Sequence, residues 1–185
     1  MRVSLLRSAA AGVMLGAAWG VLARVWMRLI STDPEFSWEG TLAIVGMSAV
    51  LGLGVGLVHA ARQGGRSRWW TLAVVPGLLL FLSPGMLMAP AFVLGGLAWS
   101  GRGWVARTVG SLATLASVGL ATWVMVEDLS SPLTVGFGLG DIVAFLGGYV
   151  LLVLGLALAS GLVWRRTRRT PDLVAAEVRL RAATT

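Results

Sequence analysis

The sequence predicts an all-α fold: a polytopic transmembrane helix bundle with six membrane segments and both termini in the cytoplasm. The chain is 57% apolar and 12% charged, with a mean hydropathy of +0.84, whereas a soluble domain carries far more polar surface. Uncharged runs of about 20 residues, long enough to cross a hydrocarbon core of about 30 Å, recur along it. The segments between these runs are, in order, basic, acidic, basic, basic, acidic and basic. Because short arginine-rich loops stay in the cytoplasm, this alternation sets the orientation.

Three of these runs, and the N-terminal apolar stretch that carries Arg24 and Arg28 near its end, have the length of one membrane helix each. We expect these helices at residues 8–30, 41–61, 108–126 and 142–164. The first resembles a signal peptide, since Arg2 and Arg7 precede it. Its apolar run continues towards Ile30 without a small-x-small cleavage site, so we interpret it as a membrane helix.

Residues 69–101 form a run of 33 residues without a charge, which is too long for one crossing because a straight helix would measure about 50 Å. Residues 83–85, Ser-Pro-Gly, interrupt it near its middle. A hairpin here places 13 of the 15 arginines in the cytoplasm and six of the eight carboxylates outside, whereas a single crossing would export the basic cluster 165–169. The sequence therefore predicts a hairpin, with arms kinked at Pro76 and Pro90. Each arm would reach only about 23 Å, so two crossings of a thinned bilayer and a re-entrant loop both fit.

The membrane domain is expected at residues 1–169, followed by a cytoplasmic tail at 170–185 that is either a short amphipathic helix or unstructured. Tryptophans lie near the expected membrane boundaries, as in an aromatic belt. They are Trp38 and Trp123 on the outer side, and Trp69, Trp70, Trp99, Trp104 and Trp164 on the cytoplasmic side.

Small residues follow a four-residue spacing in the first helix, at Gly12, Gly16 and Gly20. This spacing lets a second helix approach closely, which is how membrane helices associate when lipid is as apolar as the helix surface. The neighbour would be either the glycine-rich helix 41–61 of the same chain, which we favour, or a second subunit.

Arg24 and Arg28 project from one side of the same helix, near its outer end. They would either form ion pairs with the acidic side chains of the next loop, which we favour, or clamp an anion or a lipid phosphate at the outer leaflet. The acidic partners would be Asp33, Glu35 and Glu39.

The stretch 24–41 contains Pro34, Glu35, Phe36, Ser37, Trp38, Gly40 and Thr41. It resembles a PEFSWxGT signature of small uncharacterised multi-pass membrane proteins of actinobacteria, over about a fifth of the chain. The resemblance implies a membrane bundle and no assigned activity. Phe36 and Trp38 would anchor a short interfacial helix that follows a cap at Asp33. The candidate interaction site is therefore Arg24, Arg28, Asp33, Glu35, Phe36 and Trp38.

A second candidate is the loop before the last helix, in which residues 134–138 resemble the selectivity filter of potassium channels. Two residues intervene before Asp141, and the seven residues 127–133 are too few for a pore helix. The simpler interpretation is a glycine-rich outer loop in which Asp141 is the N-cap of the last helix. The candidate pathway residues are Thr134, Gly136, Phe137, Gly138 and Asp141.

The chain has no cysteine, one histidine and no recognised catalytic motif. We therefore predict no enzyme activity, metal or cofactor. The arginines punctuate apolar spans, which excludes a nucleic-acid-binding face. The favoured function is a packing or accessory subunit of the cell membrane, whose partners are the bilayer, an anionic lipid, and a second copy or another membrane protein. The alternative is a transporter or channel component that uses the 134–140 loop and the 69–101 hairpin. A lipid-modifying enzyme is the third class considered.

Overall fold

A computed structural model describes residues 5–30, 37–82, 85–101, 103–129 and 138–164, and these residues form helices and short connections only. The α-helices are α1 (Leu5–Ile30), α2 (Trp38–Gln63), α3 (Ala89–Val93), α4 (Trp104–Leu129) and α5 (Leu139–Trp164). Three 3₁₀ helices are η1 (Arg68–Leu82), η2 (Met86–Met88) and η3 (Gly95–Trp99). The prediction of an all-α fold is confirmed. By length and composition, α1, α2, α4 and α5 can each cross a membrane. The predicted tail at 170–185 lies outside the described residues.

All four long helices begin three or four residues before their predicted starts, and in two of them a polar side chain caps the start. The Ser37 hydroxyl accepts a hydrogen bond from the Gly40 amide at 3.2 Å, which starts α2 at Trp38. At α5, the Asp141 carboxylate reaches back to the Gly138 amide at 2.9 Å. Asp141 is therefore the third residue of α5 and not its N-cap as predicted, since the chain already turns helical at Leu139.

The C-terminal end of α4 also differs from the prediction. The helix continues to Leu129, so Glu127 and Asp128 belong to its last turn rather than to the following loop. Negative charge near a helix C-terminus is mildly unfavourable, so this extension has no support from the helix dipole.

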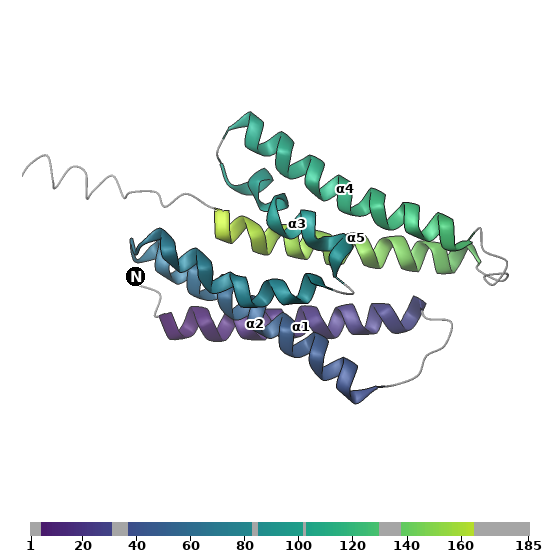
Figure 1. Cartoon of the computed structure of the whole chain (residues 1–185), viewed down its shortest axis with the longest axis horizontal. Helices are drawn as coiled ribbons and strands as arrows, with labels where there is room; N and C mark the ends of the chain where they lie inside the picture. The colour runs from purple at the N-terminus through teal and green to yellow at the C-terminus, as the bar shows by residue number, and fades with distance from the viewer. Residues whose placement is uncertain (1–4, 31–36, 83–84, 102, 130–137, 165–185) are drawn as a thin grey trace, which may run out of the picture.

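The connections of the bundle gather at two ends (Figure 1). The start of α1, the α2–η1 and η3–α4 connections and the end of α5 lie together at the left. The end of α1, the start of α2, the end of α4 and the start of α5 lie at the right. We call the left end the arginine end, because Arg7, Arg62 and Arg107 lie in helix turns there. Glu39, Glu127 and Asp141 lie in helix turns at the other end, which we call the acidic end although Arg28 also lies there, in the last turn of α1.

Residues 68–99 fold back on themselves as two short arms. The first arm is η1, which runs along α2 away from the arginine end, and the second arm (86–99: η2, α3 and η3) returns towards it (Figure 1). Because η1 is a 3₁₀ helix of 15 residues, it extends about 30 Å at about 2 Å per residue. The expected length of about 23 Å was therefore too short for this arm, since it assumed α-helical rise. Pro76 lies within η1 and Pro90 in the first turn of α3, where the second arm changes from 3₁₀ to α.

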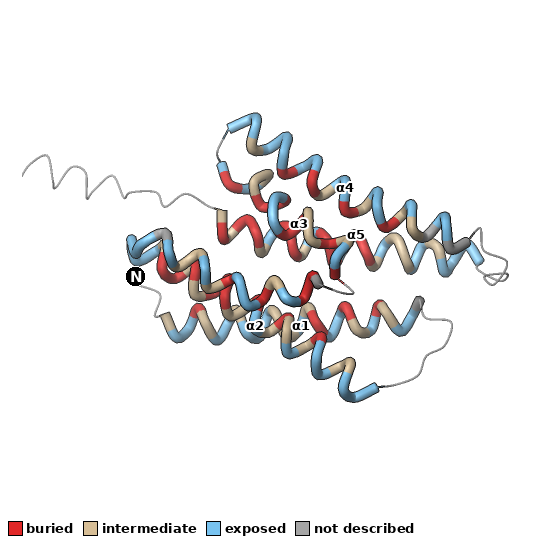
Figure 2. The backbone as a smooth tube through the Cα atoms, in the orientation of Figure 1, coloured by how far each residue is buried: buried red, intermediate tan, exposed pale blue. Residues whose placement is uncertain are grey.

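Helix α5 is the centre of the fold. It packs against α1 and α2 on one side and against α3, η3 and α4 on the other. Figure 2 shows buried residues along the facing sides of these helices and exposed residues along the outer side of α4. The most deeply buried side chains of α5 are Leu152 and Val153. A helix that is apolar on all sides suits this central place.

Two serines satisfy the backbone where the second arm is broken. The Ser117 hydroxyl of α4 accepts from the Ala91 amide at 3.0 Å, and the Ser160 hydroxyl of α5 accepts from the Gly96 amide at 3.2 Å. Both serines are fully buried, at 0% and 1% exposed. An unpaired amide in an apolar medium costs several kcal/mol, so these hydroxyls make the helix breaks tolerable inside the bundle.

Candidate functional site

The glycines of α1 lie directly on the backbone of α2. A Cβ added at Gly12 would overlap the Gly52 carbonyl, and one at Gly16 would overlap the Ser48 carbonyl. The contact is reciprocal, because a Cβ at Gly52 would overlap the Gly12 carbonyl. At Gly20 an added Cβ would lie 2.9 Å from the Ser48 side chain. The partner of the small-residue pattern in this chain is thus α2, at a separation only glycine permits.

Two tryptophans of α1 hold this helix against α5. The Trp19 indole donates to the Leu152 carbonyl at 3.2 Å, and the Trp26 indole donates to the Phe145 carbonyl at 3.1 Å. Each ring covers a glycine three residues further along α5, because a Cβ at Gly155 would meet Trp19 and one at Gly148 would overlap Trp26.

The two contacts repeat with a spacing of seven residues on both antiparallel helices. Seven residues are close to two helical turns, so the tryptophans share one face of α1 and their glycines share one face of α5. The two contacts join α5 to the C-terminal half of α1, which runs towards the acidic end of the bundle.

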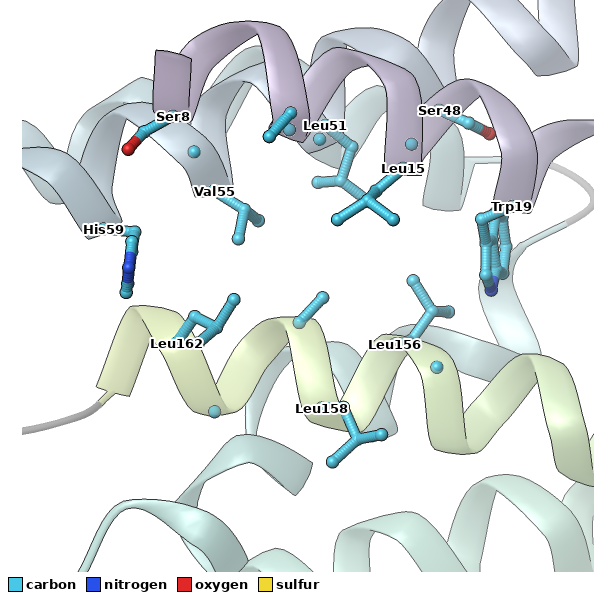
Figure 3. Close-up of a pocket in the computed structure, with 18 of the residues that line it drawn as sticks. Ser8, Leu15, Trp19, Ser48, Leu51, Val55, His59, Leu156, Leu158 and Leu162 are labelled. Atoms are coloured by element: carbon cyan, nitrogen blue, oxygen red, sulfur yellow. The ribbon is translucent and has the colours of Figure 1, made fainter. Parts of the chain in front are cut away.

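On the other side of Trp19, towards the arginine end, a cavity of about 980 Å³ lies between α1, α2 and α5. Apolar side chains make up most of its wall, including Leu15 of α1, Leu51 and Val55 of α2, and Leu156 and Leu162 of α5 (Figure 3). Gly12, Gly16, Gly52 and Gly56 also border it.

Most polar groups of this cavity lie at its arginine end; the exception is Ser48 of α2, near Trp19, whose hydroxyl donates to the Ile44 carbonyl at 2.7 Å. Figure 3 shows Ser8 and His59 at one end of the space and Trp19 at the other. Arg7 lines the same cavity, next to Ser8 in the first turn of α1. The His59 ring lies within hydrogen-bond distance of the Gln63 amide nitrogen, at 2.8 Å. The cavity is therefore amphipathic: the guanidinium of Arg7 lies at its arginine end, and its interior is mainly apolar.

At the opposite end, the predicted interaction site is described only in part. Arg24 donates through Nε to the Thr41 hydroxyl at 3.1 Å, and that hydroxyl donates to the Ser37 carbonyl at 2.8 Å. Arg24 thus ties α1 to the first turn of α2. Arg28 lies in the last turn of α1. Asp33, Glu35 and Phe36 lie outside the described residues, so the predicted ion pairs stay a prediction.

Trp38 is the first residue of α2 and is exposed. Trp38 belongs to the long helix α2, whose start Ser37 caps, and the other residues of the predicted interfacial helix lie outside the described residues.

Of the candidate pathway residues, Thr134, Gly136 and Phe137 lie outside the described residues. Gly138 and Asp141 form the start of α5, where the Gly138 carbonyl also accepts from the Asp141 amide at 3.1 Å. This pair explains how α5 begins.

The sequence predicted neither the cavity nor most of the residues that line it, Gly12 and Gly16 excepted. A signal was available for one boundary, since Trp19 and Trp26 are seven residues apart, as are Gly148 and Gly155. No local pattern links Arg7 to His59, because the packing of α1 on α2 brings them to one cavity. Among the described residues, no group of three or more His, Asp or Glu side chains is placed to hold a metal ion.

Comparisons with protein families, with curated proteins and with solved structures find no match to this chain. The resemblance of residues 24–41 to actinobacterial membrane proteins therefore stays a prediction.

Proposed function

We propose that this chain is an integral protein of the cell membrane, with six membrane segments and both termini in the cytoplasm, that acts without catalysis as an accessory subunit in the bilayer. The separation of charge between the two ends of the bundle supports the orientation. The arginine end would face the cytoplasm, and the acidic end would face outwards.

The observation that carries the accessory role is the use of interior polar groups for helix packing. Trp19 and Trp26 bond the backbone of α5, and Ser117 and Ser160 bond the backbone of the second arm. These groups fix helix positions rather than present a reactive centre. A bundle built in this way offers rigid apolar surfaces to lipid and to other membrane helices.

Native mass spectrometry of the full chain, extracted from its own membrane without detergent exchange, tests the accessory role. A stoichiometric membrane-protein partner is the expected result. A chain that emerges only as a monomer with lipid would contradict it. Reporter fusions test the orientation separately: fusions after Gly103 and at the C-terminus should report from the cytoplasmic face.

A transporter or channel component is the second candidate, favoured by the broken second arm beside the large cavity. Trp99 of η3 lines that cavity, so the two features adjoin. Flux into liposomes that contain the purified chain tests this candidate. Flux that falls when Gly136 and Gly138 are changed to alanine would favour it over the accessory role, and absent or unchanged flux would remove it.

A further inference from the structure

We propose that the cavity between α1, α2 and α5 binds an acyl chain of an anionic glycerophospholipid, with the lipid phosphate beside Arg7. This deepens the proposed function by naming a lipid partner, and it rests on the proposed orientation only for the name of the leaflet, the cytoplasmic one. The site differs from the predicted anion clamp at Arg24 and Arg28, which lies at the opposite end of α1.

The depth of the cavity matches one leaflet of a bilayer. From Ser8 at its mouth to Trp19 at its opposite end there are eleven residue steps of α1, which correspond to about 16 Å. Half of a hydrocarbon core of about 30 Å is about 15 Å. The Trp19 indole, fixed by its bond to the Leu152 carbonyl, borders the cavity at this depth.

A lipid can reach the cavity from the side, between α1 and α5. Leu15 lines the cavity although 71% of its surface is exposed, and its neighbour Ala11 is also exposed. The tryptophan contacts join α1 to α5 only from Trp19 towards the acidic end.

The distribution of polarity fits an anionic amphiphile. The interior is lined mainly by apolar side chains, with the Ser48 hydroxyl already bonded to the Ile44 carbonyl, whereas Arg7, Ser8 and His59 lie at the arginine end. A guanidinium and a hydroxyl suit the oxygens of a phosphate, and an arginine close to an anionic lipid surface strengthens binding about fivefold.

The wall of the cavity suits an acyl chain, because most of its lining is apolar. A flexible hydrocarbon chain adapts to the irregular wall that Leu51, Val55 and Leu156 form.

Lipid competition tests the proposal. The purified full chain is mixed with equal amounts of phosphatidylglycerol and phosphatidylcholine of identical acyl chains, and the lipids it retains are measured by native mass spectrometry. We expect phosphatidylglycerol to be retained about fivefold over phosphatidylcholine. The preference should disappear in Arg7→Gln and remain in Arg107→Gln, a control that removes the same charge from an exposed site on α4 outside the cavity.

The cavity itself is tested by filling it. Ala11→Trp should lose retention of both lipids, whereas Ala10→Trp, one residue away on an exposed position that does not line the cavity, should retain them. Equal retention by the two variants would overturn the site. Equal retention of both lipids by the unmodified chain would overturn the anionic headgroup. A dimer that Ala11→Trp abolishes would assign the cavity to a second copy and overturn the lipid.

A measurement on the unmodified chain guards against misfolded variants. Phosphatidylglycerol with a photoreactive group in mid-chain should label α1 between Ser8 and Trp19 and α5 between Gly155 and Leu162. Labelling spread evenly over the outer side of α4 would contradict the proposal. Lipid retention does not depend on the orientation of the chain in the membrane. Reporter fusions that place the termini outside would therefore contradict the proposed topology without contradicting this site.

Discussion

The Trp26 indole donates a hydrogen bond to the Phe145 carbonyl across 119 residues of sequence, at 3.1 Å. The Trp26 ring also lies 5.4 Å from the Phe145 ring and 5.7 Å from the Tyr149 ring, measured between centroids. Gly148 of α5 lies against the Trp26 indole, and a Cβ at this position would overlap the ring. Together with the matching Trp19 contact, the Trp26 side chain fixes the distance and the register of α1 against α5, which form opposite walls of the cavity.

Replacing Trp26 by phenylalanine should lower the free energy of unfolding by about 1 kcal/mol through the lost hydrogen bond, with a further loss from reduced ring contact. Trp123→Phe is the matched control, because Trp123 is exposed on α4. Denaturant titration in detergent micelles, followed by circular dichroism, measures both. Equal stability of the two variants would show that the indole bond does not hold α1 in place.

Replacing two different glycines of α2 by alanine, Gly52 and Gly46, should change the free energy of unfolding in opposite directions. Gly52→Ala should destabilise by about 1–3 kcal/mol, because the added methyl meets the Gly12 backbone, which cannot move aside. Gly46→Ala should stabilise by about 0.5–1 kcal/mol, since nothing lies within 4 Å of its added Cβ and alanine favours the helix. The same titration measures the pair, and a shift of both in one direction would contradict the α1–α2 contact.

Removing the hydroxyl of Ser117 should cost about 1–3 kcal/mol, because Ser117→Ala leaves the Ala91 amide without its partner in an apolar surrounding. Ser111→Ala, on an exposed position of the same helix, should stay within about 0.5 kcal/mol. Hydrogen exchange of residues 89–93 provides a local readout, since the second arm should exchange faster only in Ser117→Ala. Unchanged exchange there would remove the proposed capping role.

Tyr149 is 3% exposed and its hydroxyl has no hydrogen-bond partner in the described structure. Tyr149→Phe should therefore leave stability unchanged or raise it by about 1 kcal/mol, because a buried unpaired hydroxyl is removed while the ring contacts remain. Thermal unfolding of the two proteins side by side measures this. A clear loss of stability would mean that the hydroxyl bonds a group, such as a water, that the protein itself does not supply.

Some features of the fold follow from local sequence alone. The uncharged runs predicted the four long helices within a few residues, and the interruption at 83–85 predicted that the segment 69–101 would fold back. Helix ends were less accurate. Ser37 and Asp141 moved the starts of α2 and α5 by three residues, since a cap depends on backbone geometry as well as on residue type.

The helical type of the first arm was also beyond the sequence interpretation. Its residues are equally apolar in a 3₁₀ or an α-helix, and packing of Gly77 on Leu51 and Gly54 on Ala73 accompanies the longer form. The first arm is therefore longer than the α-helical rise per residue predicts.

The sequence by itself determined that the chain forms apolar helices and how charge is divided between their ends, because each of these properties belongs to a short stretch of residues and to its cost of transfer into hydrocarbon. The tertiary structure alone decided that α5 lies at the centre of the bundle, that Trp19 and Trp26 rest on glycines of α5, and that Arg7 and His59 line one cavity. Those relations depend on rotation and register between helices far apart in sequence, and membrane helices settle them by close packing and backbone hydrogen bonds that no local pattern encodes.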